Sequence, residues 1–144
     1  MKKIKIFGLI AALTGLISFP AVAGDFDGSK PLICALMDLV ECDAGAKCQS
    51  KTAEELGLPQ FIRINFDEKK ISGPPSGGSD KSTPIENLKH IDGKLIIQGA
   101  QDGVEDVRDG VGWSLAIAVE TGKLVLTASG DEAGFVVFGA CTLP

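Results

Sequence analysis

The fold is decided by residues 113–141, which read WSLAIAVETGKLVLTASGDEAGFVVFGAC. Large apolar side chains alternate with small ones over residues 113–119, and two further apolar runs follow at 123–129 and 135–141. Glycine-containing turns at residues 120–122 and 130–134 separate the three runs. Alternation with a period of two indicates β-strands, and short connections between successive strands are typical of an antiparallel meander. We therefore expect three consecutive antiparallel strands here.

The preceding part of the chain continues the same pattern. Residues 61–66 alternate with a slip in register, and residues 85–91 and 94–99 surround an Asp-Gly pair, which is a strong signal for a two-residue hairpin turn. Residues 72–83 are rich in Gly, Pro and Ser, so we expect an exposed loop there. Because an open sheet leaves unpaired edges, the sequence predicts an all-β fold, an antiparallel meander closed or curled into a small barrel.

One short helix is expected near the N-terminus of this domain. Thr52 is a suitable N-cap, Glu55 follows three residues later as in a capping box, and Gly57 and Pro59 would end the helix promptly. The apolar residues 32–40 fit either a strand or a short helix, and their neighbours do not decide between the two.

The first 23 residues have the pattern of a secretory signal peptide. Three lysines precede a charge-free apolar run at residues 6–19, and Ala-Val-Ala at 21–23 suits signal peptidase cleavage. The run is too short to span a bilayer. We therefore expect a signal peptide at 1–23, a single β domain at 24–144, and a periplasmic or secreted protein without a membrane span.

The charge of the expected mature chain restricts its partners. Of 14 basic residues three lie in the signal segment, which leaves 11 against 19 acidic residues and a formal charge of −8. Such a surface repels phosphate backbones and anionic headgroups, so binding to nucleic acid or to a membrane surface is disfavoured.

Four cysteines in an exported chain indicate two disulfides. Four cysteines allow three pairings, and the small residues between Cys42 and Cys48 suit a short closed loop. The pairing expected is therefore Cys42–Cys48 with Cys34–Cys141. A zinc site is disfavoured because the chain has no CxxC motif and one histidine.

Several motifs resemble those of a family of small exported bacterial proteins of uncharacterised function. They are the run Pro31–Cys48, the TAEE of residues 52–55, the PQF of 59–61, Trp113-Ser114-Leu115, and the ending FGAC of 138–141. The resemblance covers nearly the whole mature chain and implies export and a shared β fold, without an activity. A looser similarity, in meander layout alone, is to lipocalin-like barrels, although the Gly-x-Trp opening of that family is absent.

No residue pattern identifies a catalytic or metal site. His90 is the single histidine, at a strand end, and no G-x-S-x-G nucleophile motif accompanies it. The acids of residues 102–109 (Asp102, Glu105, Asp106, Asp109) do not have the spacing of an EF-hand calcium loop. The glycines of residues 73–78 lack Walker spacing, so no phosphate-binding cofactor is indicated.

The strongest candidates for a binding site are large side chains inside the β structure. Trp113, Leu115 and Ile117 share one face of a strand, and Phe135 begins a later strand, so these four are candidate pocket or core residues. The sequence favours a non-catalytic binding or accessory protein for a small apolar ligand or a protein partner. The alternatives are a small periplasmic hydrolase built from scattered acidic residues and His90, or a protein inhibitor that acts through the loop at 72–83.

Overall fold

A computed structural model describes residues 25–74, 82–103 and 106–144, so the predicted signal peptide lies outside the described residues. The described residues form ten strands and no helix. The strands are β1 (Leu32–Asp43), β2 (Gln49–Lys51), β3 (Phe61–Asn65), β4 (Lys70–Ser72), β5 (Ser82–Pro84), β6 (Asn87–Ile91), β7 (Lys94–Gln101), β8 (Val111–Ala118), β9 (Lys123–Ser129) and β10 (Ala133–Thr142).

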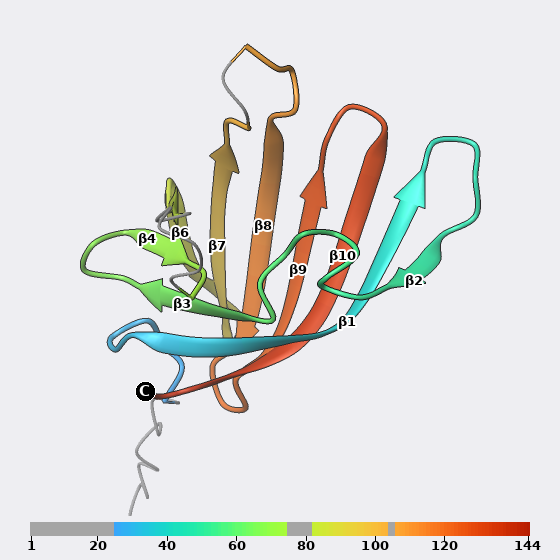
Figure 1. The fold of residues 1–144 in the computed structure, drawn as a ribbon. Coiled ribbons are helices and arrows are strands. Elements are labelled where there is room, and N and C mark those ends of the chain that lie inside the picture. Colours follow the sequence, from blue (N-terminus) through green and yellow to red (C-terminus); the bar gives the residue numbers. More distant parts are fainter. Residues whose placement is uncertain (1–24, 75–81, 104–105) are drawn as a thin grey trace, which may run out of the picture.

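These strands make one antiparallel sheet that curls into a half-barrel (Figure 1). The order is β5-β4-β3-β1-β10-β9-β8-β7-β6, and β2 pairs with β1 beside this path. The meander expected from the sequence is present as β6 to β10. Asp92 and Gly93 have φ values of 47° and 69°, which suit a hairpin turn that needs positive φ at both central residues. The all-β prediction is confirmed, in its curled form.

Strand β1 is the long central strand, which settles the choice left open between strand and helix for residues 32–40. Its register against β10 shifts between Leu36, opposite Gly139, and Asp38, opposite Phe138. Met37 is the extra residue of this β-bulge, and bulges bend the strand that carries them. β1 bends visibly along its length in Figure 1, and it pairs with β3 before the bulge and with β2 after it.

The two ends of the sheet are joined by residues 82–91, part of which we predicted to be loop. β5 pairs with β4, and the Ile85 amide still donates to the Lys69 carbonyl at 2.8 Å. The next amide, that of Glu86, donates instead to the Gln98 carbonyl of β7 at 2.9 Å, and β6 continues along β7. One continuous segment therefore passes from one end of the curled sheet to the other.

The helix predicted at Thr52 is wrong, because residues 53–57 form turns instead. The capping box itself is present: the Thr52 amide donates to Glu55 Oε2 at 2.7 Å, and the Glu55 amide donates to Thr52 Oγ1 at 3.2 Å. The hydrogen bond from the Thr52 amide, followed by the one that the Thr52 hydroxyl donates to Glu55 Oε2 at 2.9 Å, lowers the pKa of the Glu55 carboxylate. Gly57 has a φ of 62° and Pro59 follows, so the segment ends early. It is too short for its hydrogen bonds to offset the unfavourable free energy of helix nucleation.

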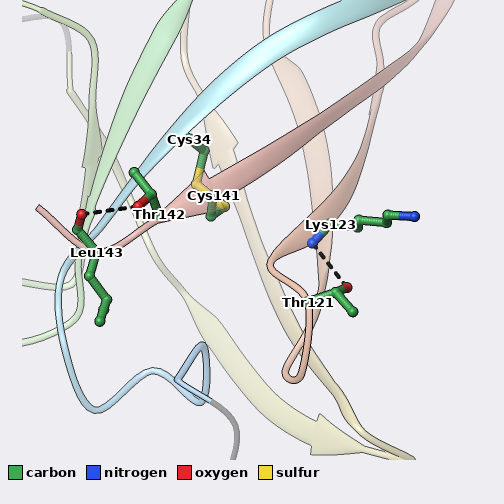
Figure 2. The surroundings of a disulfide bond; sticks show 6 residues. All are labelled: Cys34, Thr121, Lys123, Cys141, Thr142 and Leu143. Atoms are coloured by element: carbon green, nitrogen blue, oxygen red, sulfur yellow. Dashed lines mark hydrogen bonds between the residues drawn. A yellow bond between two sulfur atoms is a disulfide. The ribbon is translucent and has the colours of Figure 1, made fainter.

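Both predicted disulfides are confirmed. Cys34 and Cys141 lie directly opposite each other on β1 and β10, as Figure 2 shows, and their bond links residues 107 positions apart. Cys42 and Cys48 close the connection between β1 and β2. Two disulfides indicate an oxidising environment outside the cytoplasm. Within the described residues, no helix has the length and apolarity needed to cross a membrane.

The core occupies one end of the half-barrel. Leu95 and Ile97 of β7, Leu115 and Ile117 of β8, and Leu124 of β9 are buried there, together with Leu32, Cys34 and Ile64. Further along the same strands, the inward residues are partly buried or, at Gln101, exposed. The inner face of the sheet is therefore filled with side chains at one end and open at the other.

Candidate functional site

The open end of the half-barrel contains a cavity of about 710 Å³. Its walls come from the inward residues of the strands next to the core, among them Leu126 of β9 and Val137 of β10. The turn that replaces the predicted helix covers one side through Leu56, Leu58 and Pro59. Leu36 and Ile62 complete the wall next to the buried core. The cavity is thus a continuation of the core that side chains leave unfilled.

Trp113 is the largest side chain in the cavity wall, and it is held in a defined position. It lies directly opposite Gly99 of β7, where a Cβ atom would collide with the indole ring. Its Nε1 donates to Thr83 Oγ1 of β5 at 3.2 Å, and the Thr83 hydroxyl donates to the Ala100 carbonyl at 3.2 Å. The absence of a side chain at Gly99 makes room for the ring, and Thr83 satisfies the polar group of a half-buried indole. This contact also links β5 to β8.

Of the residues that the structure describes, none with a charged side chain lines the cavity. Its polar side chains are Ser72, Ser82, Thr83 and Gln101, which lie on β4, β5 and β7. The remaining residues of the wall are apolar or are glycine and proline. A concave, mostly apolar site with a few polar groups on one side is the usual form of a site for a small organic ligand.

The four candidate pocket or core residues separate into two pairs. Trp113 and Phe135 line the cavity, whereas Leu115 and Ile117 are fully buried in the core. Leu126 and Val137 line the cavity as well, although the sequence did not single them out. The sequence contains a signal for both residues, because each is an inward residue of an alternating strand in the meander that includes the strand of Trp113.

The structure does not bring His90 to this cavity. His90 lies on β6, is exposed, and has its Nε2 2.6 Å from the Asp27 carbonyl oxygen. Hydrogen bonds from Ser29, through its side chain and then its backbone, lower the pKa of the Asp27 carboxylate, and His90 contributes less. His90 is absent from the cavity wall, and no carboxylate of the described residues is in that wall either.

The acids considered as calcium ligands lie in the connection between β7 and β8. Asp102, Asp106 and Asp109 belong to the described residues, whereas Glu105 lies outside them. Within the part of the chain that the structure describes, no group of three or more His, Cys, Asp or Glu side chains is placed to hold a metal ion. Arg108 and Asp109 also border an open depression of about 430 Å³ with Asp131 and Glu132, which lie in the turn between β9 and β10.

A second apolar surface lies on the outer face of the sheet. Phe138 of β10 pairs with Val125 of β9, which pairs with Ala116 of β8, and Ala116 pairs with Ile96 of β7. Phe138 is 45% exposed and Val125 is 38% exposed. The middle of the sheet is therefore apolar on both faces, and the cavity of about 710 Å³ lies on the inner face.

Comparison with known proteins gives no match: no family model fits the chain, and no curated protein or solved structure is significantly similar to it.

Proposed function

We propose that this protein is an exported, non-catalytic binding protein that holds a small apolar ligand in the open end of its half-barrel. The observation that carries the proposal is the cavity of about 710 Å³ next to the core, in which no described wall residue is charged. Sites for small organic ligands have volumes of about 300–1,000 Å³. An aliphatic or aromatic molecule placed there would bury its surface against Trp113, Leu126 and Val137 and gain the free energy of leaving water.

The geometry of the cavity wall supports binding over catalysis. The single histidine of the chain lies elsewhere, and the described residues of the wall supply neither a carboxylate nor a cysteine thiol. Ser72, Ser82 and Thr83 contribute hydroxyl groups, and no described residue of the wall is a base that could activate one of them as a nucleophile. What the wall supplies is apolar area with hydrogen-bonding groups on one side.

The two disulfides support a place of action outside the cytoplasm, and the pattern of residues 1–23 supports export in particular. We assign the protein to the periplasm or the secreted fraction on these grounds. A carrier or accessory protein of this kind would hold a poorly soluble molecule in an aqueous compartment.

The proposal is tested by filling the cavity. Ala128 lines it from β9, so Ala128→Phe should place a ring in the ligand space. Ala140 is exposed on the outer face of β10, so Ala140→Phe is the matched control. Titration with the neutral fluorescent dye Nile red should give saturable binding to the wild type and to Ala140→Phe, and binding weakened ~tenfold or more by Ala128→Phe. Equal binding by the two variants would reject the cavity as the site.

A further inference from the structure

The cavity wall favours one electrostatic class of ligand. A carboxylate brought into it would lose its hydration and meet no Lys, Arg or His side chain of the described residues, because none of these lines the wall. Burying a charge without a partner is far more costly than burying a neutral hydroxyl or amide that can hydrogen-bond. The same wall accepts an alcohol, ester or amide without this penalty.

The polar groups of the wall are gathered on one side. Ser72 ends β4, Ser82 and Thr83 lie on β5, and Gln101 ends β7. Serine hydroxyls and the glutamine amide both donate and accept hydrogen bonds, so they suit a neutral polar group of either kind. The opposite side, made by Leu36, Phe135 and Val137, is apolar.

The strand connections beside the open end give a second reason to expect an uncharged ligand. Gln101 and Val111 border the connection between β7 and β8, and Ala128 and Phe135 lie near the turn between β9 and β10, at the same end of the sheet (Figure 1). The described residues of these two connections carry one basic residue, Arg108, and five acidic ones: Asp102, Asp106, Asp109, Asp131 and Glu132. A ligand that kept a carboxylate outside the cavity would meet this predominantly negative border.

We infer that the ligand is an uncharged amphiphile, an apolar chain or ring system with a neutral hydrogen-bonding group, and that the matching carboxylate is excluded. The inference rests on the proposed binding function and specifies its ligand class. The apolar body lies against Trp113, Leu126 and Val137, and the neutral polar group lies at Gln101 and the serines of β4 and β5.

Two probes of equal chain length test this selectivity. 1-Decanol and decanoate at pH 8, where the acid is ionised, should displace Nile red from the wild-type mature protein with apparent affinities that differ ~tenfold or more in favour of the alcohol. Because the alcohol is also the less soluble molecule, a second comparison isolates charge. Gln101→Lys places a cation in the cavity wall, and Gln98→Lys places one on the outer face of the same strand.

Gln101→Lys should raise the affinity for decanoate relative to decanol by ~tenfold, and Gln98→Lys should leave the ratio unchanged. Equal displacement by the two probes, or the same ratio in both lysine variants, would overturn the selectivity and leave the binding function standing. Binding of Nile red without displacement by either probe would overturn the proposed ligand class. No binding of Nile red by the wild type would reject the binding function and the inference with it.

Discussion

Replacing Gly99 by alanine should destabilise the protein, because this glycine makes room for Trp113. A Cβ atom at residue 99 would lie 2.5 Å from the Pro84 carbonyl oxygen and 2.9 Å from Cε2 of Trp113. Rotation of the indole relieves one of these clashes, but the other is with backbone and requires β5 to move. Overpacking costs about 1–3 kcal/mol. Loss of the hydrogen bond from Trp113 to Thr83 adds ~1 kcal/mol, so we expect a total of about 2–4 kcal/mol.

The matched control is Gly112→Ala on the neighbouring strand, where a Cβ atom would have no neighbour within 4 Å. This change should leave stability unchanged or raise it by about 0.4–1 kcal/mol, because alanine restricts the unfolded chain. Urea unfolding followed by fluorescence measures both variants, since Trp113 is the single tryptophan of the chain. If Gly99→Ala unfolds with the same free energy as Gly112→Ala, the packing described for Trp113 is wrong.

Three further predictions concern the disulfides, the capping box and the histidine. Cys141→Ser should cost about 4–5 kcal/mol and Cys48→Ser about 2 kcal/mol in urea unfolding, because the first bond closes the longer loop; equal losses would contradict this. Because the pKa of Glu55 is lowered in the folded protein, the stability that its ionised form contributes is present above its unfolded pKa and is lost as pH falls through the folded value. An NMR titration should place its midpoint below that of a denatured reference, and a midpoint at or above the reference would refute the capping box. His90→Ala should change the free energy of unfolding by less than about 1 kcal/mol, and a larger loss in thermal or urea unfolding would assign this exposed residue a structural role.

The sequence was sufficient to predict the strands that pair with their neighbours along the chain. Alternation and turn residues located β7 to β10, because each strand pairs with the next along the chain. β5 was missed, since its three residues become a strand only through pairing with β4 and through the contact of Thr83 with Trp113. The helix was overpredicted because a capping box is a local signal, whereas helix formation depends on length.

The cavity could not be predicted because it depends on how far the sheet curls. Trp113 and Leu115 share one face of β8 and have the same pattern in sequence, yet Leu115 is buried in the core and Trp113 lines an open space. The difference lies in their position along the half-barrel, which is set by the bend of β1 and by the passage of residues 82–91 between the two ends of the sheet. Both features depend on contacts between segments that are far apart in the sequence.

The proposed function depends most on which face of the sheet binds an apolar molecule, since the outer face is apolar as well. Leu126 and Val137 line the cavity, and their sequence neighbours Val125 and Phe138 are exposed on the outer face. Intermolecular NOEs from bound 1-decanol therefore report the face directly. We expect NOEs to the methyl groups of Leu126 and Val137 and to the Trp113 ring. NOEs to Val125 and Phe138 instead would show that the ligand binds the outer face and would contradict the proposed function.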